Sequence, residues 1–156
     1  MKLTANFTLD ELIKSQVAER KGINNNPSPE QIENLKALAV NILQPIRSHY
    51  NEALQISSGF RCAELCIAIG SSVNSQHVAD DNAAAADFEI WGRDNKEVAT
   101  FIKDNLEFDQ LILEFYKEGE PNSGWIHCSY SSNHNRNQCL YASRGENGKT
   151  KYTPWV

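Results

Sequence analysis

The order of helix and strand signals along the chain is the feature that most constrains its fold. Thr8 and Glu11 form a capping-box pattern, which predicts a short helix over residues 9–19. A second capping box begins at Ser28, with a proline at the first helical position, and predicts a longer helix that Pro45 kinks or restarts. The apolar residues of this longer helix recur at helical spacing on one face: Ile32, Leu35, Leu38, Ala39, Ile42 and Ile46.

Strand patterns come mostly after these helices. We expect strands at residues 54–56, 85–91, 108–116 and 125–130, and further helices at 63–69 and from a capping box at 94–97. From residue 131 onward the sequence is polar and no element is predicted. Helices that precede the strands favour an α+β fold, with N-terminal helices packed on a small, mainly antiparallel sheet. The length of 156 residues fits one domain over residues 1–156.

Charge and hydropathy argue against two kinds of partner. The formal net charge is -5 and the chain has no basic tract, which argues against nucleic acid as a partner. The apolar stretches are too short to span a membrane, and the N-terminus has no apolar segment of a secretory signal. We therefore expect a protein made in the cytoplasm, without a signal peptide. We expect a monomer. The cysteines form no C-x-x-C pair and are expected to be reduced thiols.

The stretch SQHVADDNAAAADFE, residues 75–89, contains the first candidate functional side chains. His77 and Asp87 are set apart by what the sequence predicts to be an alanine-rich loop. Asp87 then opens the predicted strand, in which Asp87 and Glu89 point away from the apolar side. A buried carboxylate costs free energy unless it is paired, and a metal ion is one partner that would satisfy it.

His127 is the third candidate, in the strand over residues 125–130 among apolar neighbours. Two histidines and one carboxylate match the catalytic type of zinc site, which has three protein ligands and an open fourth position. Zinc in such a site acidifies a bound water and polarises a carbonyl. A histidine on an apolar strand is also commonly a hydrogen-bonded core residue, so from these residues alone both interpretations stay open.

The chain resembles the M15 peptidases, the zinc D-Ala-D-Ala carboxypeptidases and related phage and bacterial peptidoglycan peptidases. The resemblance runs almost end to end, through FTLDELIKSQVAERKGI, PSPEQIENLKALAVNILQPIR, ISSGFRCAELCIAIGSSVNSQH, AAADFEI, FDQLILEF and GWIHCSY. The family pattern S-x-H, A-x-D and H falls on Ser75, His77, Ala85, Asp87 and His127. The resemblance implies Zn2+ held by His77, Asp87 and His127, and a compact α+β fold shared in its core with the hedgehog signalling domain.

Two features depart from the family pattern. The gap between His77 and Asp87 is longer than usual and lacks a glycine, so VADDNAAAA is interpreted as a loop insertion of a few residues. Such an insertion adds little to the cost of loop closure. Many relatives have an acidic residue three positions before the final histidine, where this chain has Gly124.

The resemblance also implies roles for residues around the predicted metal. Glu114 is the candidate general base, which takes a proton from water and passes it to the leaving amine. Glu89 is a rival base, although its strand position favours orienting a ligand histidine. The Arg61 guanidinium is expected to bind a substrate carboxylate or the negative charge of the intermediate. Ser75 and Trp125 are further substrate-side candidates.

Each of these roles has a simpler alternative. Glu114 could be an exposed strand residue, Arg61 could form a surface ion pair that holds its turn, and Trp125 could simply pack. Asp109 is expected to cap or pair near the start of its strand.

The resemblance implies a zinc-dependent peptidase that hydrolyses peptide-stem bonds of peptidoglycan, as a D-Ala-D-Ala carboxypeptidase or an endopeptidase. A small acidic domain suits a phage lysis enzyme (an endolysin), or one that lets a phage enter its host, delivered to the cell wall. The alternative is a non-catalytic, zinc-containing wall-binding or virion structural module of the same fold. Gly124 and the long ligand gap favour the module, whereas the ligand set with Glu114 and Arg61 favours the enzyme.

Overall fold

A computed structural model describes residues 1–155, and Val156, the last residue of the predicted domain, lies outside the described residues. The described chain has the predicted α+β fold, with helices packed on a six-stranded, mostly antiparallel sheet. The strand order is β1-β2-β4-β3-β5-β6, in which β3 and β5 run parallel. The strands are β1 (Gln55–Ser58), β2 (Ala83–Glu89), β3 (Gln110–Glu114), β4 (Trp125–Ser131), β5 (Gln138–Arg144) and β6 (Thr150–Pro154).

Three helices, α1, α3 and α6, begin directly after their predicted N-cap residues Thr8, Ser28 and Asp94. The capping boxes at Thr8 and Ser28 are both formed. The helices are α1 (Leu9–Ile13), α2 (Gln16–Lys21), α3 (Pro29–Leu38), α4 (Gln44–Tyr50), α5 (Ala63–Ala68) and α6 (Asn95–Asn105), with a π-helical turn η1 (Ala39–Leu43) and a 3-10 turn η2 (Gln76–Val78).

The prediction of one helix over residues 9–19 is wrong. The backbone is extended at Lys14, and the Ser15 side chain then accepts a hydrogen bond from the Ala18 N–H and caps a second helix. A second N-cap inside the helical pattern thus divides the segment into α1 and α2.

The predicted disturbance at Pro45 is confirmed. The π-helical turn η1 lies between α3 and α4, and Pro45 occupies the first turn of α4. Proline has no N–H to continue the α-helical hydrogen-bond pattern, so the helix is rewound at this point and starts again.

The alanine-rich segment before Asp87 is not a loop. Strand β2 begins at Ala83, and the four alanines from Ala83 to Ala86 are buried within it. The backbone of Ala83–Ala86 pairs with residues 128–131 of β4, and this pairing overrides the modest strand propensity of alanine. The connection after η2 is therefore only residues 79–82, and Asp87 lies near the end of its strand rather than at its start.

The polar tail, for which no element was predicted, forms the last two strands of the sheet. Strands β5 and β6 pair antiparallel around a turn in which the Gly145 N–H donates to the Lys149 carbonyl at 2.7 Å. Gly148 adopts a φ of 73° in this turn, a conformation that favours glycine.

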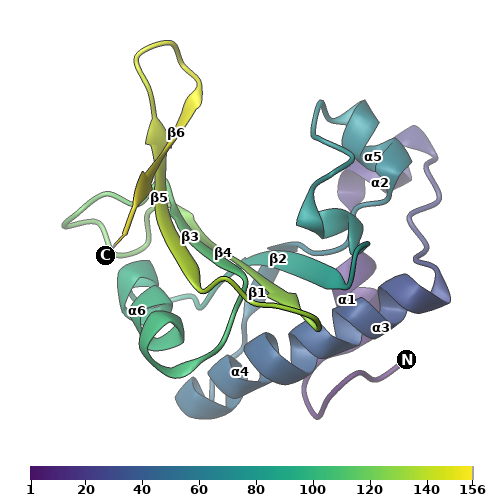
Figure 1. Cartoon of the computed structure of the whole chain (residues 1–156), viewed down its shortest axis with the longest axis horizontal. Coiled ribbons are helices and arrows are strands. Elements are labelled where there is room, and N and C mark those ends of the chain that lie inside the picture. The colour runs from purple at the N-terminus through teal and green to yellow at the C-terminus, as the bar shows by residue number, and fades with distance from the viewer. Residues whose placement is uncertain (156) are drawn as a thin grey trace.

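The two faces of the sheet differ (Figure 1). Helices α3, α4 and α6 cover one face, and α5 and the β5–β6 hairpin rise on either side of the other. The core lies on the helix-covered face and includes Leu38, Ile42, Ala86, Phe88, Ile102, Leu111, Leu113 and Ile126. Within residues 1–155, no helix combines the length and the apolar character that crossing a membrane requires.

Candidate metal centre

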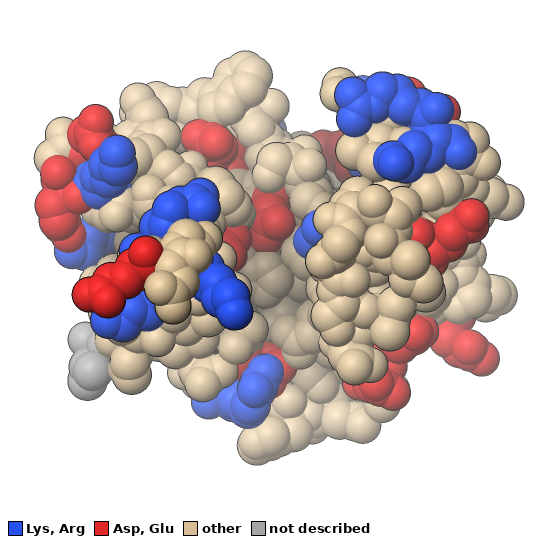
Figure 2. Space-filling view, turned by 90° about the horizontal axis from the view of Figure 1, so that it is seen from above, with Lys and Arg blue, Asp and Glu red and all other residues tan. Residues whose placement is uncertain are grey.

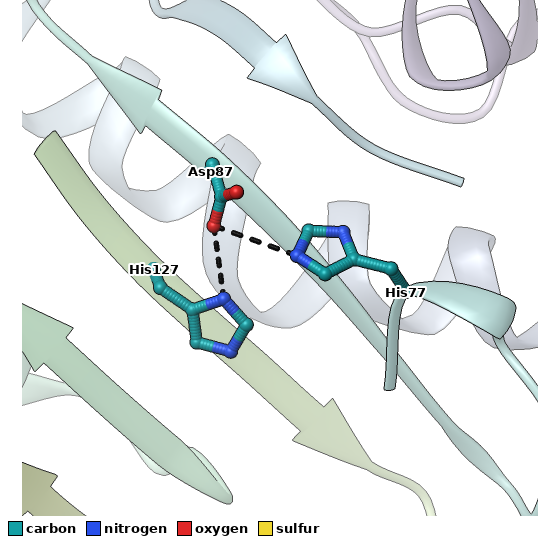
Figure 3. A group of neighbouring side chains, drawn as sticks. All are labelled: His77, Asp87 and His127. Atoms are coloured by element: carbon teal, nitrogen blue, oxygen red, sulfur yellow. Dashed lines mark hydrogen bonds and ion pairs between the residues drawn. The ribbon is translucent and has the colours of Figure 1, made fainter. Parts of the chain in front are cut away.

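Three side chains predicted as metal ligands meet on the open face of the sheet. Asp87 of β2 and His127 of β4 are direct partners in the antiparallel register, so their side chains lie side by side. His127 Nδ1 lies 2.9 Å from Asp87 Oδ1, and His77 Nε2, from the turn η2, lies 3.5 Å from the same oxygen (Figure 3). The three ligand atoms all lie within 4.8 Å of one another.

The environment of His77 leaves one ring nitrogen free to bind a cation. His77 Nδ1 lies 2.7 Å from the Gly59 carbonyl oxygen. Since a carbonyl only accepts, Nδ1 carries the proton and Nε2 presents its lone pair toward Asp87. A lone pair and a carboxylate oxygen that face each other fit a bound cation. Gly59 is required here, because a Cβ at this position would collide with the Leu12 carbonyl.

The protonation states of the group also suit a metal. Burial lowers the pKa of His77, although the nearby Asp87 carboxylate acts in the opposite direction. Burial by itself would raise the pKa of Asp87, but its contacts with His127 and His77 hold it well below its usual range. A neutral His77 and an ionised Asp87 are the forms that bind a divalent cation, and the donor set of two nitrogens and one oxygen fits zinc.

Glu114 lies on the same face as the three candidate ligands. In the register of β3 and β4, Ile112 lies opposite His127, so Glu114 follows two residues later on the same side. Burial raises the pKa of Glu114, and the negative charge of Asp87 raises it further. Glu114 is partly buried, which argues against the alternative of a fully exposed strand residue.

Arg61 lies beside the group and has an incomplete set of partners. Its backbone N–H donates to the His77 carbonyl at 2.9 Å, which ties the Gly59–Arg61 turn to η2. Its buried side-chain Nε has no hydrogen-bond partner, and Arg61 forms no ion pair with any described residue. The alternative of a surface ion pair is therefore wrong for the described part of the chain.

A cavity of about 900 Å³ joins these residues. Its lining includes His77, Asp87, His127, Glu114 and Arg61. Viewed from above, the molecular surface has a hollow between two raised parts, and Asp or Glu side chains are visible at its bottom (Figure 2).

The family model described as peptidase M15 matches residues 5–129. The chain belongs to the M15 peptidase family. M15 peptidases are zinc-dependent metallopeptidases, and the His-Asp-His group of this M15 chain could hold such an ion. No curated protein matches the chain.

Of the remaining predicted site residues in this M15 chain, Ser75 lines the cavity, whereas Trp125 and Glu89 do not. Ser75 lines the cavity, and its hydroxyl accepts a hydrogen bond from the His77 N–H at 3.2 Å, so it also caps η2. Trp125 does not line the cavity; its ring packs against Phe115 with centroids 5.4 Å apart. This contact fits the packing alternative, and the role of Trp125 in binding substrate stays a prediction. Glu89, the rival base, lies opposite Gln55 of β1 in the strand register and is also outside the cavity lining.

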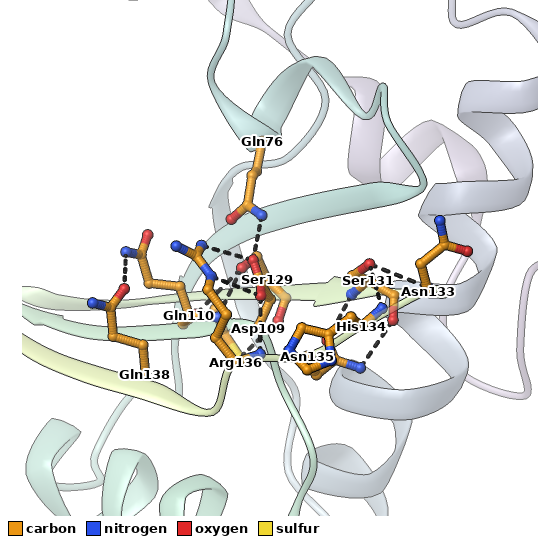
Figure 4. A network of polar contacts seen from close by, with 11 residues as sticks. Gln76, Asp109, Gln110, Ser129, Ser131, Asn133, His134, Asn135, Arg136 and Gln138 are labelled. Atoms are coloured by element: carbon orange, nitrogen blue, oxygen red, sulfur yellow. Dashed lines mark hydrogen bonds and ion pairs between the residues drawn. The ribbon is translucent and has the colours of Figure 1, made fainter.

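Asp109 organises the far end of the cavity in this M15 chain (Figure 4). Arg136 donates to it from Nε at 3.0 Å and from Nη2 at 2.8 Å, and Gln76 Nε2 donates to it at 2.6 Å. These hydrogen bonds lower the pKa of Asp109 to about 2, and the bond with Arg136 has the largest effect. The prediction that Asp109 pairs near the start of its strand is confirmed by its ion pair with Arg136. The hydrogen bond from Gln76 joins the start of β3 to η2, next to His77.

Arg136 and Tyr152 also line the cavity, and the sequence did not indicate a site role for either residue. Both come from the polar tail beyond residue 131, where no periodic pattern predicts a strand or a shared face. The acidic side chain of Asp109 was the only sequence signal for a basic partner. Nothing in the sequence pattern indicated that Tyr152 returns to the site.

Proposed function

We propose that this M15 protein is a zinc peptidase that hydrolyses peptide-stem bonds of peptidoglycan, as a D-Ala-D-Ala carboxypeptidase or an endopeptidase. The observation that carries the proposal is the convergence of His77 Nε2 and His127 Nδ1 on one oxygen of Asp87. This group lies in a cavity that also contains a partly buried carboxylate, Glu114, and a guanidinium, Arg61.

The chain supplies residues for each part of an amide hydrolysis. Zinc held by His77, Asp87 and His127 would polarise the scissile carbonyl and acidify water. Glu114 takes a proton from the attacking water and returns it to the leaving amine. A raised pKa suits this double task, because the same carboxyl must accept and then release a proton near neutral pH.

Arg61 supplies fixed positive charge. Its buried Nε lacks a partner in the described protein, so a bound substrate would satisfy it. The guanidinium hydrogen-bonds either a carboxylate of the peptide stem or the negative charge that develops on the carbonyl oxygen. This requirement fits stems that end in, or carry, a free carboxylate.

The resemblance to phage peptidoglycan peptidases extends the proposal to a biological role. An acidic domain of net charge -5 that acts at the cell wall fits a phage lysis enzyme, or one that lets a phage enter its host. Its partners would be peptidoglycan stems rather than nucleic acid or membrane.

The test is to incubate zinc-loaded protein with purified peptidoglycan and to identify released fragments by mass spectrometry, beside a chelated sample. The proposal predicts stem-peptide fragments that disappear with the chelator, and their masses name the bond. Protein that binds no zinc would point instead to hydrogen-bonded histidines without a metal. Zinc-loaded protein that releases nothing from several wall types would contradict the enzyme.

Two sequence features favoured a non-catalytic module, and both have a structural explanation. Gly124 has a φ of 65°, and a Cβ there would collide with the Glu114 carbonyl, so no acidic side chain fits this turn. Of the nine residues between His77 and Asp87, the four alanines belong to strand β2 and residues 79–82 form the connection after η2. Glu114 offers a carboxylate in the cavity in place of an acidic residue at position 124, which supports the enzyme, and the module becomes the interpretation if zinc-loaded protein binds walls without cutting them.

A further inference from the structure

The β5–β6 hairpin lies after the residues that the M15 family model matches, yet it contributes to the cavity. The model match ends at residue 129, whereas the hairpin spans 138–154. In Figure 1 the hairpin rises beside the open face of the sheet, on the side away from α5. Tyr152 of β6 lines the same cavity as Asp87 and Glu114.

The strand register explains how Tyr152 reaches the site. Glu114 of β3 is the partner of Ala142 in β5, and Ala142 is the partner of Tyr152 in β6. Direct partners point to the same face of a sheet, so Tyr152 faces the cleft together with Glu114. Two strand spacings separate their backbones by about 10 Å. The intervening Ala142 has only a methyl group, which leaves room for the phenol to lean across it.

The hydroxyl of Tyr152 is available to a ligand. The residue is 53% exposed, and its hydroxyl makes no hydrogen bond to the described part of the protein. Partial burial, with the negative charges of Glu114 and Asp87, raises the pKa of Tyr152. The phenol therefore stays protonated at neutral pH and can donate a hydrogen bond.

We propose that Tyr152 is a substrate-binding residue whose hydroxyl donates a hydrogen bond to a carbonyl oxygen of the peptide bound beside Glu114. The inference rests on the proposed peptidase function and adds a contact from outside the matched family region. Loss of one neutral hydrogen bond costs about 3- to 10-fold in affinity. The contact lies to one side of the reacting atoms, so the loss is expected in KM rather than in kcat.

The test compares wild-type protein with Tyr152→Phe and with a matched control, Tyr141→Phe. Tyr141 is the neighbour of Ala142 in β5, faces the other side of the sheet and stacks on Trp155 with centroids 5.1 Å apart. KM and kcat are measured on zinc-loaded protein with a synthetic stem pentapeptide that ends in D-Ala-D-Ala, or with the stem that the peptidoglycan digest identifies. The dissociation constant of the same peptide is measured by calorimetry on zinc-free protein, and bound zinc is quantified in every variant.

The expected result is a 3- to 10-fold rise in KM and in the dissociation constant for Tyr152→Phe, with kcat within 2-fold, zinc content unchanged and Tyr141→Phe like wild type. A Tyr152→Phe variant that matches wild type in both measurements overturns the role of Tyr152 and leaves the peptidase function intact. If wild-type protein cleaves no substrate, the proposed function fails, and the calorimetric comparison alone decides whether Tyr152 binds peptide. Absence of peptide binding to wild-type protein also overturns the proposal.

Discussion

The two faces of the central strands carry opposite chemistry on neighbouring residues. On β2, Phe88 is fully buried against the helices, whereas Asp87, one residue earlier, lies in the cleft. On β4, Ile126 is likewise fully buried and its neighbour His127 lies in the cleft. Both pairs are joined by direct register, Asp87 with His127 and Phe88 with Ile126.

This comparison shows why the candidate site can exist. Burial by itself disfavours the charge of Asp87, but its contacts with His127 and His77 more than offset that cost and lower its pKa. The apolar face adds stability, since burying a side chain such as Phe88 contributes about 1.5–3 kcal/mol. It also keeps the two strands in the register that brings Asp87 and His127 together. Changes on the two faces should therefore have separable effects.

The largest separation is expected for Asp87→Asn. Loss of a residue that only hydrogen-bonds a metal ligand lowers metal affinity by about 10- to 100-fold. Asp87 is itself a candidate ligand, so its loss should lower zinc affinity by more than this. Peptidase activity should fall with the zinc, while the protein still unfolds cooperatively. Zinc affinity is measured by competition with a chromophoric chelator, and folding by circular dichroism.

A matched control for Asp87→Asn is Glu89→Gln, which changes a carboxylate on the same strand outside the cavity lining. Glu89→Gln should keep wild-type zinc affinity. Equal zinc affinity in Asp87→Asn and wild-type protein would rule out the carboxylate as a ligand.

The opposite face is tested with Phe88→Ala. Truncating this fully buried ring should destabilise the protein by about 3–5 kcal/mol, because the cavity left behind cannot collapse completely. Zinc affinity of the folded fraction should change far less than in Asp87→Asn. Urea denaturation gives the stability, and zinc titration at low temperature gives the affinity. A Phe88→Ala variant with wild-type stability but impaired zinc binding would break the division between the faces.

A smaller effect is expected at the far end of the cleft, for Asp109→Asn. The change weakens hydrogen bonds to a charged partner, Arg136, and should cost about 1–3 kcal/mol at neutral pH. The folded pKa of Asp109, about 2, lies below its unfolded value of about 3.9. Its contribution is therefore present above about pH 4 and is lost as the pH falls toward 2.

The measurement for Asp109 is stability against pH in wild type and variant. Wild-type protein should lose its advantage over Asp109→Asn between about pH 4 and pH 2. The exposed residue Asp81 gives a control, since Asp81→Asn should stay within about 0.5 kcal/mol of wild type. A constant difference between Asp109→Asn and wild type across this range would show that the ion pair does not stabilise the fold.

Two of the three candidate ligands, Asp87 and His127, could be predicted because they lie on strands with clear patterns. Alternation around Asp87 showed which face it shares, and the M15 pattern joined it to His77 and His127. The capping boxes at Thr8 and Ser28 were predictable for a similar reason, since each depends on residues three positions apart.

The elements that were missed depend on packing that leaves no local pattern. The β5–β6 hairpin has few buried side chains, so its strands show no apolar alternation. The alanines before Asp87 looked like a loop, although Ala85 and Ala86 also fell within the predicted strand, and all four became strand through backbone pairing with β4. Tyr152 reaches the cleft through the pairing of β6 with β5, and Arg136 through its ion pair with Asp109. Both contacts join residues far apart in the sequence, so sequence spacing does not show them.

The most direct test of the account is to measure bound zinc and stem-peptide release together for Glu114→Gln and wild-type protein. The account predicts that Glu114→Gln keeps its zinc and its fold but releases fragments about 100- to 10,000-fold more slowly, because general-base catalysis is lost. Glu89→Gln should release fragments at the wild-type rate. Wild-type turnover in Glu114→Gln, with zinc fully bound, would contradict the assignment of this cleft as a hydrolytic centre served by Glu114.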